Sequence, residues 1–364
     1  MSDWNNRFTA LIRQSRPNLW GNWALASHIQ PGAVGFVDPS TGAFKLVSAQ
    51  LPGIEVDESG TSSQWKLSSE GVSRHQGDAK AQVSIVDPNT GLAISPEVEF
   101  IWKFENKDSL ASEFAIARQG TVRNLGILSD QYNWLLTEAQ KVGFAQNGKI
   151  AQGFGVITEV IYAQSGLNVG SNDRDASYTL GGTVAGLHAM LGEGGPKAAV
   201  KGNYGYSRQT RSLDKHMWPA SEGAVAQAPV AVAYAFSSFE GRTVLPAWRG
   251  RIDRLAIHLD SKARKATTYI TKAALQYTLG DNRHSERSIT IAAGQSGTFA
   301  SIPLEASQVS LELTFVGLIN DVKQTLSWDL PLAQWPMGNM YIDISGTWPG
   351  KPKATIRDDL NNRR

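Results

Sequence analysis

Cysteine is absent from the 364 residues, which excludes disulfides, thiolate nucleophiles and cysteine-ligated zinc or iron–sulfur sites. The chain also lacks an apolar run long enough to span a bilayer, so we expect no transmembrane helix. Because the start of the chain is polar and charged, without the apolar centre of a secretory signal, we expect a protein that is cytoplasmic as synthesised. The formal net charge of +2 favours no nucleic-acid partner.

Motifs of catalysis are also missing. Residues Gly143 to Lys149 match the G-x-x-x-x-G-K part of a phosphate-binding loop, but Ile150 takes the position of the magnesium-binding serine or threonine. The six histidines lack the local spacing of a metal site. We therefore expect no enzyme, no cofactor and no metal, and a protein that acts through its surfaces.

The pattern of short alternating strands and turn clusters predicts a β-rich α+β fold. Residues 1–240 are expected to form a twisted antiparallel sheet with a few helices. Residues 241–253 mix arginine, proline and glycine and predict a linker. Residues 254–364 contain short alternating strands and predict a C-terminal β-sandwich domain.

The first predicted helix ends before Pro17 and is amphipathic and basic. Aromatic and aliphatic side chains recur at helical spacing on one side, and arginines lie on the other. Such a helix can bind anionic lipids, because each arginine near a charged bilayer contributes about 1 kcal/mol. The residues expected to bind a membrane are Trp4, Arg7, Phe8, Leu11, Arg13 and Arg16.

Two hairpins are expected to enter the membrane. The first runs from Gln82 to Phe104 and the second has arms at 177–191 and 197–208, joined by a glycine-rich turn. Each arm exceeds the ~9–11 residues that a membrane-spanning strand needs. The predicted lipid-facing side chains are Val98, Phe100, Trp102, Phe104, Leu180, Val184, Met190, Val200, Tyr204 and Tyr206.

The order of these features resembles the pore-forming domain of the gasdermin family over residues 1–240. A basic first helix precedes the sheet, and a capped helix is followed by the strand FGVITEVIYAQSGLNV, a long hairpin and the apolar strand PVAVAYAFSS. The resemblance implies a toxin or a cell-death or defence protein that oligomerises on a lipid bilayer. It also implies a C-terminal domain that restrains or targets the pore, and membrane association in the active state.

Two alternatives remain open from the sequence. The C-terminal segments LAIHLDSKARKATTYITKAALQYTLGD and SWDLPLAQWPMGNMYIDISGTW loosely resemble β-sandwich modules of phage and tail-like particles, which favours a non-enzymatic structural or attachment protein. Trp248, Trp328, Trp335 and Trp348 could instead form a glycan-binding platform in the C-terminal domain, although filling a core is the commoner use of tryptophan.

Overall fold

The computed structural model describes residues 3–38, 40–79, 85–86, 93–94, 96–193, 204–222, 224, 228–262, 269–317, 320–347 and 352–357. It divides into two compact units, Met1–Arg242 and Thr243–Arg364. Both are built mainly from antiparallel strands, with short helices at their edges, so the expected β-rich α+β class is confirmed. The predicted linker, residues 241–253, contains the point of division.

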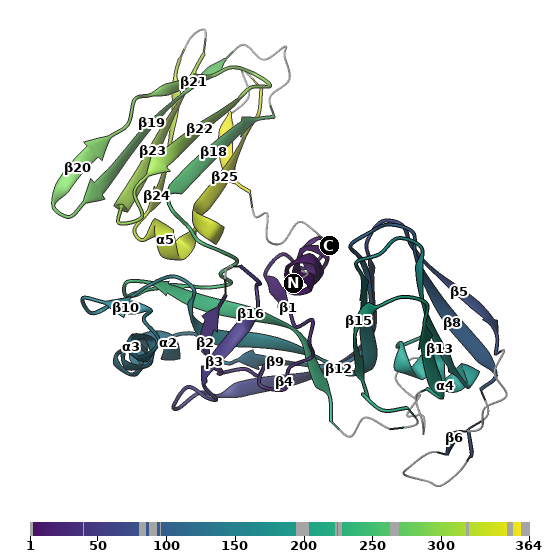
Figure 1. Ribbon diagram of the computed structural model, residues 1–364. Helices are drawn as coiled ribbons and strands as arrows, with labels where there is room; N and C mark the ends of the chain where they lie inside the picture. The colour runs from purple at the N-terminus through teal and green to yellow at the C-terminus, as the bar shows by residue number, and fades with distance from the viewer. Residues whose placement is uncertain are drawn as a thin grey trace. The chain divides into compact units, whose positions relative to one another are not determined.

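Unit 1 is organised around the 18-residue strand β12 (Phe154–Ser171), whose side chains are almost all buried. Along one side β12 pairs first with β2 (Val34–Val37) and then with β9 (Ser109–Val122). Along the other side it pairs first with β16 (Val230–Glu240) and then with β15 (Leu213–Trp218). Strand β4 (Val56–Ser68) adds to β9. We call β4, β9, β12 and β15, in that order, the central sheet (Figure 1).

Smaller elements complete unit 1 around this sheet. Strand β1 (Leu19–Gly21) pairs with β16, and β3 (Phe44–Ser48) pairs with β2. These elements are α1 (Trp4–Arg13), β1 (Leu19–Gly21), β3 (Phe44–Ser48), β6 (Ile85–Val86), β7 (Ala93–Ile94), α2 (Ile127–Asp130), α3 (Tyr132–Lys141), β10 (Ala145–Gln146) and β11 (Lys149–Ile150).

A second sheet lies beside the central one. Its strands, in order, are β5 (Val72–Asp78), β8 (Val98–Phe104), β13 (Ala176–Gly182) and β14 (Tyr206–Gln209). Helix α4 (Val184–Met190) follows β13 and packs against β9 and β12 of the central sheet (Figure 1). We call these four strands the folded-over sheet, because each one continues a strand of the central sheet in the same order.

The pairing register shows the continuity. Strands β9 and β12 pair Ser109 with Ser171, and β8 and β13 pair Phe104 with Ala176. Phe104 lies five residues before Ser109, and Ala176 lies five residues after Ser171. The inner strands therefore continue without any offset. The outer pairs, from β4·β9 to β5·β8 and from β12·β15 to β13·β14, each carry an offset of three residues.

Helix α4 corrects a prediction from the sequence, where Ser177 to Leu191 is expected to be one continuous strand. The strand ends at Gly182, and Thr183 caps a helix by accepting a hydrogen bond from the Gly186 backbone N–H at 3.0 Å. Leu187 and Met190 then lie on one side of the helix and are fully buried. Capping and this helical spacing override the alternating pattern.

Unit 2 contains two sheets, and in each of them one face is buried and the other is more exposed to solvent. One has the order β22 (Ser296–Ile302), β18 (Leu255–Ser261), β25 (Asn339–Ser345) and β26 (Lys353–Ile356). The other has β20 (Asn282–Ser285), β19 (Ile270–Leu279), β23 (Ser307–Val316) and β24 (Val322–Trp328), with β21 (Ile289–Ile291) also on β19. Buried and half-exposed residues alternate along β18 and β23, as in a β-sandwich. The unit also holds β17 (Thr243–Leu245), α5 (Pro331–Gln334) and a 3-10 turn at Pro336–Gly338.

The C-terminal tryptophans lie mainly inside unit 2. Trp248, Trp328 and Trp335 are at most 7% exposed, and the rings of Trp328 and Trp335 meet edge to face. In this conformation they fill a core and do not form an exposed stacking platform. Trp348 lies outside the described residues.

Across the described part of the chain, none of the helices has the length and apolarity that crossing a membrane requires.

Candidate functional site

The two predicted hairpins meet in one buried layer between the folded-over sheet and the central sheet. From the folded-over sheet come the even-numbered residues of β8 and β13, which share a face because directly paired residues point the same way. Ala111 of β9 and Leu167 and Val169 of β12 supply the facing side. The full core consists of Val98, Phe100, Trp102, Phe104, Ala111, Leu167, Val169, Ala176, Tyr178, Leu180, Leu187, Met190, Leu191 and Tyr204.

Most of the predicted lipid-facing residues are therefore brought together, away from solvent. Phe100, Trp102, Leu180 and Met190 are at most 1% exposed. Val184 differs, since it starts α4 and is 39% exposed. Val200, like Gln82 and most of the predicted arm 197–208, lies outside the described residues.

Tyr206 is a correction to the predicted face. It pairs with Gly181, so it lies on the face of the folded-over sheet opposite Leu180. There its hydroxyl donates to Glu99, a buried carboxylate that also binds the Arg208 guanidinium. This second face is more polar, with Lys103, Ser177 and Thr179 on it.

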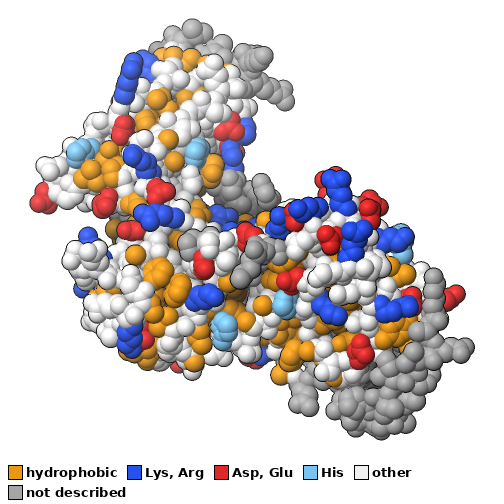
Figure 2. All heavy atoms as spheres, viewed as in Figure 1, with side chains coloured by type: hydrophobic (Ala, Val, Ile, Leu, Met, Phe, Trp, Pro, Cys, Tyr) orange, Lys and Arg blue, Asp and Glu red, His pale blue; other side chains and the backbone are white. Residues whose placement is uncertain are grey.

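Four short segments connect the two sheets, and all four lie where the strands of the central sheet end, on the same side of that sheet. They are residues 69–71, 105–108, 172–175 and 210–212, which we call the bend segments. They are polar and mostly exposed. Gly71, Asp108 and Asp175 take left-handed backbone angles there, at φ of 76°, 59° and 53°. Lys, Arg, Asp and Glu side chains gather in this part of unit 1 (Figure 2).

An ionic cluster closes one side of the layer between the sheets. Arg74 of β5 lies 2.6 Å from the Glu113 carboxylate of β9 and also binds Glu193, which follows α4. Trp102 of β8 donates its indole N–H to Glu113 at 2.9 Å. His188 of α4 lies 3.0 Å from Glu193. We call Arg74, Glu113, His188 and Glu193 the ionic cluster; it joins both inserted segments, 69–108 and 172–212, to the central sheet.

Burial dominates the electrostatics of Glu113, whose side chain is 3% exposed. Loss of hydration raises the pKa of its carboxyl group, and the Arg74 charge and the Trp102 hydrogen bond oppose this without cancelling it. At Glu193, burial also raises the pKa, but the hydrogen bond and the charge of Arg74 outweigh it and the pKa is lowered. The same guanidinium thus faces two carboxyl groups with opposite shifts.

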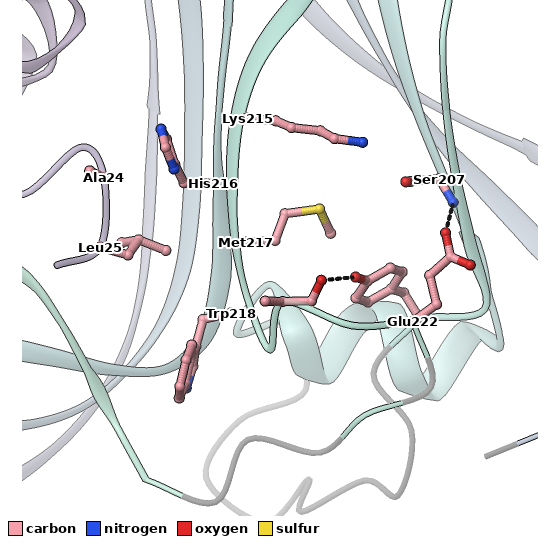
Figure 3. Close-up of a pocket in the computed structure, with 10 residues that line it drawn as sticks. Ala24, Leu25, Ser207, Lys215, His216, Met217, Trp218 and Glu222 are labelled. Atoms are coloured by element: carbon pink, nitrogen blue, oxygen red, sulfur yellow. Dashed lines mark hydrogen bonds between the residues drawn. The ribbon is translucent and has the colours of Figure 1, made fainter. Parts of the chain in front are cut away.

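A cavity of about 590 Å³ lies between the two sheets at their β14 and β15 side (Figure 3). Lys215 and Met217 of β15 face Tyr204 and Ser207 across it, whereas His216 and Trp218 lie on the other side of β15, toward Leu25. The Tyr204 hydroxyl donates to the Ala220 carbonyl at 3.2 Å, and Glu222 accepts the Ser207 backbone N–H at 3.1 Å. The space between the two sheets is therefore filled by side chains at β8 and β13 but only partly filled at β14.

Helix α1 does not present its apolar face to solvent. Trp4, Phe8 and Ile12 are at most 3% exposed and pack in a separate core with Trp23 and Trp65. Leu11 is only partly buried. Contact of Trp4 and Phe8 with lipid would therefore require α1 to leave this core, and in the present conformation that predicted contact is blocked.

The arginines of α1, and Arg16 just after the helix, have partners within unit 1. Arg13 lies 4.1 Å from the Trp20 ring centroid, and Arg16 lies 4.3 Å from that of Trp65. Arg7 donates to the backbone carbonyl of Asp108 at 2.9 Å, and its side chain is 45% exposed. Arg7 thus contacts one of the bend segments directly.

The ionic cluster is not predicted from the sequence. Arg74 falls on the same strand face as Val72, and Glu113 lies among apolar residues in LASEFAIA, so each interrupts a buried pattern. Such charges are unusual inside a core and signal a partner. Among the described residues no group of three or more His, Cys, Asp or Glu is placed to hold a metal ion.

Comparisons with known proteins give structural matches only. No protein-family model matches the chain, and no curated protein matches it. The membrane pore complex of pneumolysin matches over 84% of this chain and 69% of its own, at 10% identity and a TM-score of 0.22. A disulfide-locked mutant of intermedilysin with human CD59 matches over 92% and 85%, at 10% identity and a TM-score of 0.23. A Gram-negative toxin matches over 92% and 86%, at 8% identity and a TM-score of 0.23.

TM-scores of 0.22 to 0.23 do not establish a shared fold. The resemblance to gasdermins stays a prediction.

Proposed function

We propose that this protein is a non-enzymatic, pore-forming or membrane-perturbing protein, in which the folded-over sheet swings out and extends the central sheet into a bilayer. The observation that supports it most is the continuous register of β9·β12 into β8·β13. Because the strand order is also the same, straightening at the four bend segments keeps the strand pairs and only separates the two layers.

The lengths and faces of the segments are suited to this movement. Each inserted segment, 69–108 and 172–212, gives two arms of about 20 residues, whereas a membrane-spanning strand needs ~9–11. The layer core would become the lipid-facing side, chiefly from β8 and β13. The more polar opposite face, with Glu99, Lys103 and Arg208, would line the water-filled side.

Self-assembly is supported by the edges of the central sheet. Within the described residues β4 pairs only with β9, and its outward side leaves a 13-residue, largely exposed row of backbone groups. At the opposite edge, again counting only the described residues, β15 pairs with β12 and with no other strand. Pairing of β4 in one copy with β15 in the next is a head-to-tail contact, which forms a ring when its rotation closes.

Anionic lipid is the proposed membrane partner, through Arg7. A lipid phosphate that binds the Arg7 guanidinium competes with Asp108, and so would loosen the bend segment 105–108. In this proposal unit 2 restrains or targets the pore, glycans are the ligand class of unit 2, and the protein is cytoplasmic until it binds a membrane.

A disulfide lock tests the function. An ideal Cβ on Gly192 lies 3.4 Å from the Ala115 Cβ, close to the spacing of a disulfide, and the chain has no cysteine of its own. Because Gly192 has a φ of 78° and this Cβ lies 3.0 Å from the Ala115 Cα, the variant carries local strain, and a thermal melt of the reduced protein checks that it folds. We expect oxidised Ala115→Cys/Gly192→Cys protein to release no dye from anionic liposomes. Reduction should restore release, because the segment after α4 can then leave β9.

The matched control is Ile101→Cys/Thr179→Cys, which links directly paired residues of β8 and β13. Since these strands stay paired in the proposed extended state, oxidation should leave dye release unchanged. Absence of release by the unmodified and the reduced proteins would refute pore formation. A block by the β8·β13 disulfide would refute extension with the register kept.

A further inference from the structure

The layer between the two sheets of unit 1 must open if the folded-over sheet moves, so the groups that hold it closed control the movement. Most of this layer is apolar, and apolar contacts lose their stabilisation steadily as they are hydrated. The ionic cluster is different, because it contains charges that recover strong hydration when they separate.

We propose that the ionic cluster is a latch, in which Arg74 holds both inserted segments closed on the central sheet. Arg74 belongs to the first inserted segment and Glu193 to the second, while Glu113 belongs to β9. A single guanidinium therefore links both inserted segments to β9, the strand of the central sheet from which they would separate. The latch rests on the proposed function for its role in a membrane, but its hold on the layers can be measured without lipid.

The burial of the three side chains explains why Arg74 is the central member. The side chains of Arg74, Glu113 and Glu193 are 16%, 3% and 17% exposed. Removing the cation leaves two carboxylates close together with little access to water, an arrangement that is strongly unfavourable. Removing Glu113 is milder, because Arg74 keeps Glu193 and burial already disfavours the charge of Glu113.

The cluster is also suited to release. Fully apolar pairs of the same size would hold the layers at least as firmly, since buried ion pairs regain little beyond their lost hydration. Gln64 of β4 adds only a long contact to Glu193, at 3.4 Å, and Lys66 contributes charge from the same strand. The latch thus holds the closed form while its charged groups gain hydration on opening.

Hydrogen exchange of the full-length protein without lipid tests the latch. We expect Arg74→Gln to raise the exchange rates of β8 and β13 amides by at least about tenfold, because a sheet that undocks without lipid loses its buried apolar core and its strand pairs then open locally. The β12·β16 amides of the same molecule should change little. Adding Glu113→Gln to Arg74→Gln should restore most of the protection, because it removes the carboxylate that Arg74 neutralises. A packing role alone predicts no such rescue.

Arg118→Gln is the matched control, because Arg118 pairs with the exposed Glu58 within the central sheet and bridges no layers. It should leave exchange of β8 and β13 unchanged. If Arg74→Gln does not fold, Glu193→Gln should selectively speed exchange in α4 and β13. Equal acceleration in both sheets, or none, would overturn the latch.

Dye release from anionic liposomes separates the two proposals. Selective exchange in Arg74→Gln together with faster dye release supports both the latch and the pore. Selective exchange with no release by any variant supports the latch as a restraint on the folded-over sheet and refutes pore formation.

Discussion

The central sheet and the folded-over sheet share strand order and an inner register, yet they differ in what surrounds them. The central sheet has the α1 core on one side, with Trp4, Phe8 and Trp23, and the layer core on another part of its surface. The folded-over sheet has one buried apolar face, supplied by that single layer core. Strand pairing therefore does not distinguish a fixed sheet from a movable one. Packing on a second core does.

The largest expected effect comes from truncating one aromatic residue in each core. Phe100→Ala and Phe8→Ala each remove a fully buried ring and should each cost about 3–5 kcal/mol. For Phe100→Ala we expect fast hydrogen exchange confined to β5, β8, β13 and β14. For Phe8→Ala we expect a lower global unfolding midpoint by urea denaturation. Loss of the whole unit in both variants would show that the folded-over sheet is no separate cooperative region.

Two glycines give a smaller, graded contrast. A Cβ at Gly155 would lie 1.9 Å from the backbone oxygen of Ser237, which cannot move without shifting β16. We expect Gly155→Ala to cost about 1–3 kcal/mol of global stability. At Gly181 the obstacle is the end of the Tyr206 ring, at 2.2 Å, which can rotate away. Thermal melts should therefore show less loss for Gly181→Ala, and the opposite order would contradict the contrast.

The pH dependence should act on the layer between the sheets. Because the pKa of Glu113 is raised in the closed form, a proton binds there more tightly than in an opened form. Glu113 therefore stabilises the docking of the folded-over sheet on the central sheet at pH values below the ordinary glutamate pKa. This contribution is lost as the pH rises through the raised pKa. Glu193 acts in the opposite direction. Because its pKa is lowered in the closed form, it stabilises docking above the ordinary glutamate pKa, and this contribution is lost only as the pH falls through the lowered pKa. The groups facing Glu113 are Arg74, Lys66, Glu193 and the Trp102 indole.

Hydrogen exchange corrected for its intrinsic pH dependence measures this balance. From neutral pH down to the ordinary range of glutamate, β8 and β13 should become better protected. Glu113→Gln should abolish the change, and Arg74→Gln should move it to higher pH, because the cation that opposes the raised pKa is gone. Protection that decreases on mild acidification would mean that Glu113 is not the controlling group.

The smallest expected effect concerns Arg7. Arg7→Gln removes one charge near the bend segment 105–108 and should weaken binding to anionic liposomes by about 1 kcal/mol, or roughly fivefold, at low salt. Binding to neutral liposomes should not change, which makes them the control in a sedimentation assay. Equal weakening on both lipids would indicate a structural role for Arg7.

The sequence predicts the elements of unit 1 better than their arrangement. Both β8 and β12 are visible locally, because β8 alternates apolar and polar residues and β12 is a long run that is apolar on both faces. Helix α4 is not recognised from alternation, although the Thr183 cap and the spacing of Leu187 and Met190 signal it. That β8 continues β9 and packs back on it depends on pairing between distant segments, which no local pattern contains. The two partners of Arg74 are likewise 39 and 119 residues away along the chain.

A distance measurement between β4 and β5 tests the central claim most directly. Spin labels at Ser62→Cys and His75→Cys, both exposed sites, report whether these strands are folded back or form one strand. If the folded-over sheet extends the central sheet on anionic liposomes, the two Cα atoms should separate to about 43 Å, from 13 residues at ~3.3 Å each. An unchanged, shorter distance on liposomes that the protein permeabilises would contradict this account.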